Sequence, residues 1–315
     1  MTFKTKFLAG CQRLQDRLFQ TAIGLEQKRA GLAPKRIEVD GVEYALLQGG
    51  NPDGQTVVMV HGFAADKNNW LPLAMEMKAQ FQIIALDLPG HGESSQFYDL
   101  QEQPLDFRLP QQAERLIRVM DALGVEKFHL MGSSMGGAIA LQIAHTNHHR
   151  LHSLVLIDNA GVDGARQSEF FQLLEIGENP LIVKKPGDME KLLAFVMEQR
   201  PFMPWPMPAV IERMTLARLE LNERIFADMM QSRTEMGSPE QVLQMLQGLT
   251  IPVLVIWGAQ DRVLDVSAVE VMRKQIPRVR AVILSGVGHV PMLEVPRQVS
   301  TEFMQFTRSI SSNNK

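Results

Sequence analysis

The sequence predicts an α/β fold, in which a mostly parallel sheet is flanked by helices and carries an inserted helical cap. Strand-like and helix-like stretches alternate over residues 36–160 and again over 249–315, which is typical of parallel strands joined by crossover helices. Residues 161–248 lose the strand signals and are broken by proline and glycine, so we expect the cap there. Residues 1–35 are expected to form a separate N-terminal helical segment.

The two core segments contain elements whose order can be read along the chain. In sequence order, the expected elements are a hairpin over 37–48, a strand over 57–60, a helix over 67–79, a strand over 83–87 and a helix over 110–123. After the strand and helix around Ser134, they are strands over 153–157, 253–257 and 281–284 and a helix over 296–306. The helix over 110–123 begins at Pro110 and is followed by Gly124, which are favoured residues at these two boundaries.

One strand-to-helix junction carries a chemical motif. The apolar run Phe128–Met131 leads into Gly132-Ser133-Ser134-Met135-Gly136, the pattern G-x-S-x-G, and then into an apolar helix-like run. Such a junction holds a serine hydroxyl at the end of a sheet, with glycines where side chains would collide with the neighbouring strand and helix. Ser134 is therefore the candidate nucleophile.

The loop after the buried strand 57–60 is expected to stabilise negative charge. His61-Gly62-Phe63 follows that strand directly, and in a serine hydrolase of this kind the corresponding loop donates a backbone N–H group to the oxyanion. We expect the N–H groups of Phe63 and Met135 to be the donors, the second of them at a helix N-terminus. His61 is interpreted as a structural residue that braces the loop.

Two later strand ends supply a candidate acid and a candidate base. Asp261 follows the strand over 253–257, and His289 follows the strand over 281–284, behind two glycines. A carboxylate in this place can hold a histidine in the required tautomer and stabilise the imidazolium. Asp265 and Asp158 are rival positions for the acid.

The remaining histidines fit structural or solvated positions better than catalytic ones. Five of the eight gather around the helix after Ser134 and the strand before it, and we expect them to be solvated or at helix ends: His129, His145, His148, His149 and His152. His91 is expected to pack beneath the loops of the site.

These motifs together resemble those of the α/β-hydrolases over nearly the whole chain, from about Val42 to Phe306. The matching stretches are HGFAADKNNW (61–70), DLPGHGES (87–94), GSSMGG (132–137), WGAQDRV (257–263) and GVGHVPMLE (286–294). The chain order serine, aspartate, histidine is that of the triad of this fold. Within the fold, the chain is similar to bacterial lipases of the Moraxella and Psychrobacter type and to monoacylglycerol lipases. The resemblance implies a cofactor-free serine hydrolase of apolar acyl esters, with acylglycerols as the expected substrates.

Three alternative functions share the fold: a carbon–carbon bond hydrolase, a cofactor-free haloperoxidase-like enzyme and a non-catalytic hydrolase-like binding protein. A carbon–carbon bond hydrolase would need polar groups in the cap for a dicarboxylate, which the segment FMPWPMP (202–208) does not offer. The complete set of Ser134, Asp261 and His289 argues against a binding protein. A serine at position 134 also argues against dehalogenases and epoxide hydrolases, which place an aspartate there.

The cap is expected to determine the substrate preference. Nine of the 19 methionines lie within residues 161–248, and methionine adapts to irregular apolar partners. The segment 202–208 is apolar and cannot form a regular helix, because its prolines lack N–H groups. We expect Met203, Trp205 and Met207 to contact the acyl chain of the substrate, the alternative being that they attach the cap to the core.

Composition excludes several classes of function. A net charge of −3 with 21% charged residues predicts no general affinity for nucleic acid. The single cysteine, Cys11, excludes an internal disulfide. There is no metal-ligand spacing, no dinucleotide motif and no phosphate loop in the sequence, so we expect neither a metal nor another cofactor. The oligomeric state is left open.

The N-terminal segment is basic and amphipathic. Residues 1–36 carry a net charge of about +6, whereas the rest of the chain carries about −9. Apolar residues at helical spacing form a stripe: Phe3, Phe7, Cys11, Leu14, Leu18 and Leu25. Such a helix can lie in a membrane interface, so residues 1–30 are a candidate lipid-contacting segment, but we narrowly favour packing of the stripe on the body of the protein.

This segment also bears on localisation. The apolar stretch before Cys11 is far shorter than the roughly 7–15 residues of the apolar region within a signal peptide. We therefore expect a cytoplasmic or peripherally membrane-associated protein without a standard signal peptide. Lipoprotein export through Cys11 is the alternative.

Overall fold

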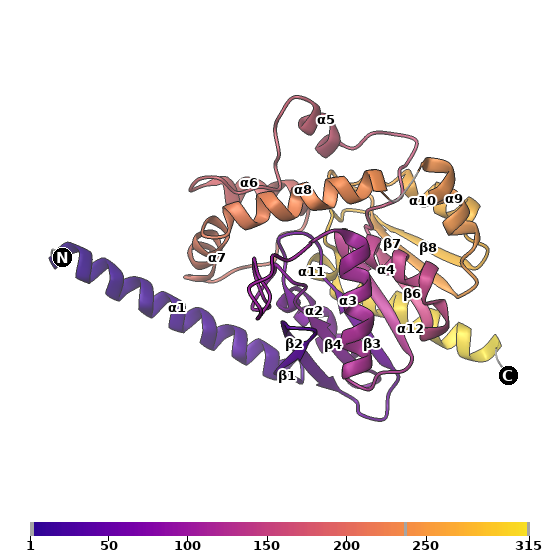
Figure 1. The fold of residues 1–315 in the computed structure, drawn as a ribbon, viewed down its shortest axis with the longest axis horizontal. Helices are drawn as coiled ribbons and strands as arrows, with labels where there is room; N and C mark the ends of the chain where they lie inside the picture. Colours follow the sequence, from indigo (N-terminus) through magenta and orange to yellow (C-terminus); the bar gives the residue numbers. More distant parts are fainter. Residues whose placement is uncertain (1–2, 236–237, 314–315) are drawn as a thin grey trace.

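An eight-stranded sheet forms the centre of the molecule, with the strand order β1-β2-β4-β3-β5-β6-β7-β8 (Figure 1). This computed structural model describes residues 3–235 and 238–313. β2 is antiparallel to β1 and β4, and all other neighbouring strands are parallel, which confirms the predicted α/β sheet. The strands are Leu32–Val39 (β1), Val42–Gly50 (β2), Thr56–Val60 (β3), Gln82–Leu86 (β4), Phe128–Ser133 (β5), Leu151–Ile157 (β6), Val253–Gly258 (β7) and Val279–Leu284 (β8).

Helices cover both faces of this sheet. Successive side chains of a strand point to opposite faces, so Val58 of β3 packs in one apolar core and Met59 in the other. The first core includes residues of α3 (Leu109–Ala122), α4 (Met135–Thr146) and α10 (Ala268–Gln275). The second includes residues of α2 (Leu71–Met77), α11 (Pro291–Glu294) and α12 (Pro296–Asn313). Two short 3-10 turns, η1 (Lys67–Trp70) and η2 (His148–Arg150), lie before α2 and β6.

The segment between β6 and β7 is helical, as the sequence predicts for the cap. It contains α5 (Glu169–Glu175), α6 (Asp188–Val196), α7 (Met207–Leu216), α8 (Leu219–Glu235) and α9 (Pro239–Gln247). Helices α5 to α8 lie along one edge of the molecule, at the top and upper left of Figure 1. In contrast, α9 buries Met245 and Leu246 in the first core, beside α10, so the end of the cap segment packs with the core layer.

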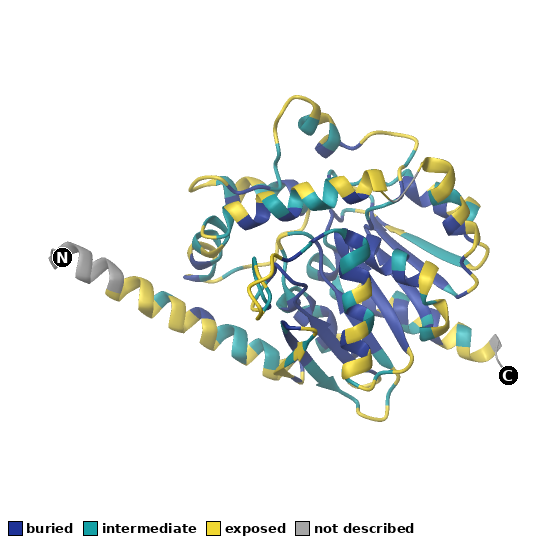
Figure 2. Ribbon diagram, viewed as in Figure 1, coloured by how far each residue is buried: buried dark blue, intermediate teal, exposed yellow. Residues whose placement is uncertain are grey.

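Helix α1 (Phe3–Arg29) projects away from the body of the protein (Figure 1). Near its middle, Gln15 and Asp16 contact Arg213 of α7 and Phe19 is buried, whereas most of the described side chains before Phe19 are exposed (Figure 2). Leu14, Leu18 and Leu25 are 56%, 41% and 55% exposed, so the favoured packing of the stripe on the body is wrong for these residues. The side chains of residues 3–9 lie outside the described ones. Among the described residues, no helix is long and apolar enough to cross a membrane.

Candidate active site

A strained turn presents Ser134 between β5 and α4. Its φ of 52° and ψ of −119° lie in a region that residues other than glycine rarely adopt. A Cβ atom on Gly132 would stand 2.3 Å from the carbonyl oxygen of Gly136, and one on Gly136 would stand 2.2 Å from that of Val60. The predicted steric need for both glycines of G-x-S-x-G is therefore confirmed.

The two serines of the motif differ in their exposure to solvent. Ser133 is the last residue of β5 and is 1% exposed, whereas Ser134 is partly exposed. A Cβ atom on Gly62 would stand 3.1 Å from the Cβ of Ser134 and 3.6 Å from its Oγ. Ser134 thus lies against the loop that follows β3, and glycine at position 62 permits this close approach.

A hydrogen-bonded acid and histidine lie at the same edge of the sheet, after β7 and β8. The Nδ1 atom of His289 is 2.8 Å from Oδ2 of Asp261, and both side chains are buried. The other oxygen of Asp261 accepts the backbone N–H groups of Val263, at 2.8 Å, and Leu264, at 3.1 Å. An ionised Asp261 in this position places the proton of a neutral His289 on Nδ1, which leaves Nε2 free to accept a proton.

The cap is tied to the loop that carries His289. The backbone N–H of His289 donates to the carbonyl oxygen of Val196, at the end of α6. The carboxylate of Glu294 accepts the N–H groups of Glu198 (2.8 Å) and Gln199 (2.7 Å) from the cap and that of Gly288 (3.0 Å) from the histidine loop. Movement of this part of the cap would therefore be transmitted to His289, the candidate base.

The two rival acids lie in different environments. Asp265 caps the turn at Ser267, whose N–H it accepts at 2.8 Å, and pairs with Arg166 on the surface. Asp158 directly follows β6, is fully buried, and accepts the N–H of Gly258 at 2.9 Å. Its carboxyl lies beside the candidate acid and base, because polar atoms of Asp158, Asp261 and His289 lie within 4.8 Å of one another. Burial, and then the charge of Asp261, raise the pKa of Asp158 well above its usual range.

These three side chains are also of the kinds that bind metal ions. The 2.8 Å between His289 and Asp261 is, however, the length of a direct hydrogen bond. That hydrogen bond accounts for the arrangement of this pair, and the absence of a metal stays a prediction.

The two candidate oxyanion donors follow Ser134 itself and Gly62, the residue of the β3 loop that lies against Ser134. Met135 is the first residue of α4, and Phe63 lies in the loop after β3, with its ring 5.7 Å from that of Phe226 in the cap. Within the described part of the chain, neither of these backbone N–H groups donates a hydrogen bond to a backbone acceptor. Both are therefore free to bind an oxyanion.

His61 braces this loop, in agreement with its predicted structural role. Its Nδ1 lies 2.8 Å from the carbonyl oxygen of Gly62, and its Nε2 accepts the N–H of Leu88 at 3.1 Å. Burial lowers the pKa of His61, so it is a neutral residue with its proton on Nδ1. His91 is also buried, with its ring 4.9 Å from that of His61, as expected for a residue beneath the site.

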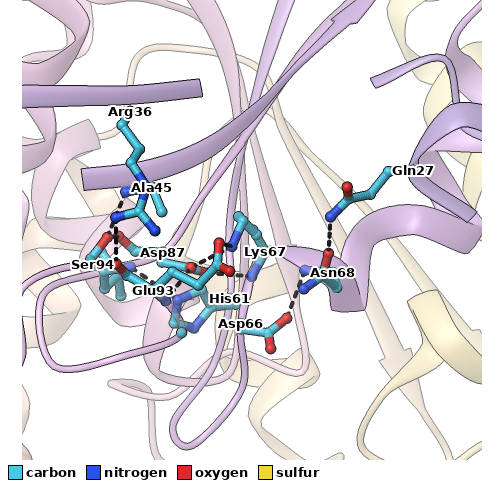
Figure 3. Close-up of polar contacts among 12 residues, drawn as sticks. Gln27, Arg36, Ala45, His61, Asp66, Lys67, Asn68, Asp87, Glu93 and Ser94 are labelled. Atoms are coloured by element: carbon cyan, nitrogen blue, oxygen red, sulfur yellow. Dashed lines mark hydrogen bonds and ion pairs between the residues drawn. The ribbon is translucent and has the colours of Figure 1, made fainter. Parts of the chain in front are cut away.

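A buried ion pair below the same loop is a feature that sequence reasoning missed (Figure 3). The ammonium group of Lys67 lies 2.7 Å from Asp87, at the end of β4, and 2.9 Å from Glu93. The backbone N–H of Lys67 also donates to Asp87, at 2.7 Å. Burial opposes the charge of Lys67, but Asp87 raises its pKa above the usual value. The sequence signal for this ion pair was the presence of charged residues within the stretches HGFAADKNNW and DLPGHGES.

The other predicted residues have mixed outcomes. His145, His148 and His149 are exposed, as expected. His129 is buried between Ser153 (2.8 Å) and Gln55 (3.2 Å), so its predicted solvated position is wrong. Burial lowers the pKa of His129 to about 3.

The apolar cap segment 202–208 is largely on the surface. Trp205 is 69% exposed and Phe202 is 90% exposed, whereas Met203 and Met207 are half-buried. The two aromatic side chains therefore do not attach the cap to the core. Contact of Met203, Trp205 and Met207 with an acyl chain stays a prediction.

Known proteins resemble this chain over most of its length. The sequence model described as "Alpha/beta hydrolase family" matches residues 57–302. Lipase 1 of Psychrobacter immobilis is 28% identical over 309 residues, which cover 96% of this chain and 94% of that protein. A monoacylglycerol lipase of Xenopus laevis is 27% identical over 328 residues, with 100% and 92% coverage. The crystal structure of a membrane phospholipase A, a bacterial virulence factor, is similar with a TM-score of 0.88 at 37% identity, and the match covers 98% of this chain and 99% of that one.

Proposed function

The chain belongs to the alpha/beta hydrolase family, and from this premise we propose that Ser134, His289 and Asp261 hydrolyse fatty acyl esters of glycerol lipids. Similarity to lipases and to a phospholipase over nearly the whole chain makes it an ester hydrolase of the lipase and esterase class. The observation that carries the proposed mechanism is the strained Ser134 at the same sheet edge as the hydrogen-bonded pair of His289 and Asp261.

In the proposed reaction, Oγ of Ser134 attacks the ester carbonyl while Nε2 of His289 accepts the hydroxyl proton. The N–H groups of Phe63 and Met135 bind the oxyanion that forms. His289 then gives its proton to the leaving alcohol, and the acyl group remains on Ser134. Water, activated by His289 in the same way, attacks the acyl-enzyme and releases the fatty acid.

The substrate class rests on what the similar proteins share. The similar proteins are named as a lipase, a monoacylglycerol lipase and a phospholipase A, and these names have acyl esters of lipids in common. Hydrolysis of p-nitrophenyl esters from C2 to C16, followed by monoacylglycerol and phospholipid with matched acyl chains, tests this class directly. We expect higher kcat/KM for long chains than for C2. A preference for C2 and no release of fatty acid from either lipid would contradict the proposal.

A lipid surface is the proposed partner of α1 and of the cap segment 202–208. Leu14 and Leu18 are exposed on α1, and Phe202 and Trp205 are exposed just before α7. Arg213 of α7 forms an ion pair with Asp16, so the cap contacts the helix that bears the exposed leucines. The basic charge of residues 1–36 favours anionic lipids. Together these features would place the cap near the surface that contains the substrate.

A further inference from the structure

Asp158 is a buried carboxyl that the proposed reaction does not use. It follows β6 with a positive φ of 43°, which turns the chain sharply at the sheet edge. One oxygen accepts the N–H of Gly258 at 2.9 Å. The other, Oδ2, is buried and has no hydrogen-bond partner among the described residues. A buried oxygen without a donor is costly for an ionised carboxylate.

The neighbour of this carboxyl is the candidate acid itself. Polar atoms of Asp158, Asp261 and His289 lie within 4.8 Å of one another. Two buried carboxyls so close together cannot both be ionised. Asp261 has three donors, namely two backbone N–H groups and His289, whereas Asp158 has one. The negative charge therefore belongs to Asp261 and the proton to Asp158.

We propose that Asp158 is a positioning residue, a neutral carboxyl that donates its O–H to Asp261 and holds that carboxylate in place for His289. This inference rests on the proposed function of Asp261 and His289. The proposed O–H donation would supply a hydrogen-bond partner for Oδ2 of Asp158, which has none otherwise among the described residues. The charged groups that face Asp158 are Asp261 and Glu294, and after burial both raise its pKa.

The hydrogen bond would act through the basicity of Asp261. Each donor to a carboxylate stabilises its ionised form, so the O–H of Asp158 makes Asp261 a weaker base. When Nε2 of His289 takes the proton of Ser134, the other proton, on Nδ1, then stays on the imidazole and does not move to Asp261. Without the donor, Asp261 would hold the imidazolium more strongly, so His289 would act as an effective base only at higher pH.

Two substitutions of similar size separate a neutral donor from other roles. In Asp158→Asn, the amide keeps an oxygen for Gly258 and an N–H for Asp261, so it reproduces the protonated carboxyl. Asp158→Leu removes the donor. We expect kcat/KM for a soluble short-chain ester to stay within about threefold of the wild type in Asp158→Asn. In Asp158→Leu we expect kcat to fall at least about tenfold with little change in KM, and the acid limb of the pH profile to move to higher pH.

An infrared measurement tests the protonation state without any catalysis. Wild-type protein at neutral pH should show the carbonyl band of a buried protonated carboxyl, and Asp158→Asn should lack it. A wild type without this band would overturn the proposal, as would an Asp158→Asn variant that loses as much activity as Asp158→Leu. Full activity and an unchanged pH profile in a folded Asp158→Leu variant would also overturn it. The band does not depend on turnover, so it tests the role of Asp158 separately from the proposed function. If the band is present but a Ser134→Ala variant stays active, the result contradicts the proposed function and not the protonation of Asp158.

Discussion

At the scale of single residues, backbone strain and burial separate Ser134 from its neighbour. Ser134 has a positive φ and partial exposure, whereas Ser133 is enclosed at the end of β5. The sequence could identify this pair because G-x-S-x-G with its flanking apolar runs is a local pattern. The steric contact of Gly132 with Gly136 follows from the same local turn, whereas that of Gly136 with Val60 arises because β3 and β5 are neighbours in the sheet.

Replacement of the proposed nucleophile is the first prediction at this scale. Ser134→Ala should lower kcat by a factor on the order of 10⁶, the size of the loss for a serine-protease nucleophile. Ser133→Ala should retain most of the activity. A fluorophosphonate probe with peptide mapping checks the assignment, and it should label Ser134 alone. Activity and labelling that survive Ser134→Ala would contradict it.

Replacement of the proposed acid is the second prediction. Asp261→Asn should cost several orders of magnitude in kcat, by analogy with the loss of about 10⁴ for the corresponding aspartate of a serine protease. The reason is that the N–H groups of Val263 and Leu264 would hold the amide oxygen, so the amide N–H would face Nδ1 of His289. His289 would then carry its proton on Nε2 and could not accept the proton of Ser134. Asp265→Asn is the matched control and should change kcat less than about threefold, because Asp265 caps a separate turn. Comparable losses in both variants would rule out a specific role for Asp261.

The position of Asp158 beside this acid could not be predicted. Strand-end placement was visible in the sequence, and it made Asp158 a rival for the role of acid. The contact with Asp261 depends on β6 and β7 being adjacent in the sheet, although the whole cap separates them in the chain. A single sequence contains no local signal for that pairing.

At the scale of elements, the loop after β3 is held by groups from outside it. Lys67 donates to Asp87 through both its backbone and its side chain, and Asp87 also accepts the N–H of Glu93 at 2.8 Å. A Cβ atom on Gly92 would stand 2.1 Å from a carboxylate oxygen of Asp87, so glycine is needed for this approach. The sequence predicted the strands and the loop, but the contacts arise because β3 and β4 are neighbours.

Loss of the buried cation is the prediction at this scale. Lys67→Met leaves Asp87 buried without its counter-charge and should destabilise the fold by about 3–5 kcal/mol. Chemical denaturation measures this change. Lys191→Met removes an exposed pair with Asp188 and should cost less than about 1 kcal/mol. Adding Asp87→Asn to Lys67→Met should recover part of the loss, and a purely additive double variant would speak against charge as the cause.

At the scale of the whole molecule, buried neutral histidines link stability to pH. The folded-state pKa of His129 is about 3, because burial and then the charge of His152 disfavour its protonation. In the unfolded chain its pKa is near the usual value of about 6.5. Between these two values the unfolded state holds a proton that the folded state lacks, so stability falls as the pH decreases.

Removal of this group should flatten the pH dependence. Between about pH 6 and pH 4, His129→Gln should lower the slope of unfolding free energy against pH by roughly 1.4 kcal/mol per pH unit. Urea titrations at a series of pH values supply the slope. His148→Gln, on the surface, should leave the slope as it is. If both variants kept the wild-type slope, His129 would not be a neutral group in the folded protein.

The exposed leucines of α1 are the basis of the proposed contact between the whole molecule and a lipid surface. The sequence found the basic amphipathic character, but two interpretations remained because packing of a terminal helix is not a local property. In the structure the leucines face outward. Substitution of Leu14, Leu18 and Leu25 by serine should therefore weaken binding to anionic vesicles by at least about tenfold, since burial of each leucine contributes up to about 1.5–3 kcal/mol.

Vesicle flotation measures this binding, and the control variant replaces the exposed polar residues Gln12, Gln20 and Thr21 by serine. Both variants should hydrolyse a soluble short-chain ester at the wild-type rate, because α1 takes no part in the proposed chemistry. Raising the salt concentration should weaken vesicle binding of every form that keeps the basic residues, since each of these is worth about 1 kcal/mol near an anionic surface and is screened by ions. Equal vesicle binding by the leucine variant and its control would show that this face of α1 does not contact lipid.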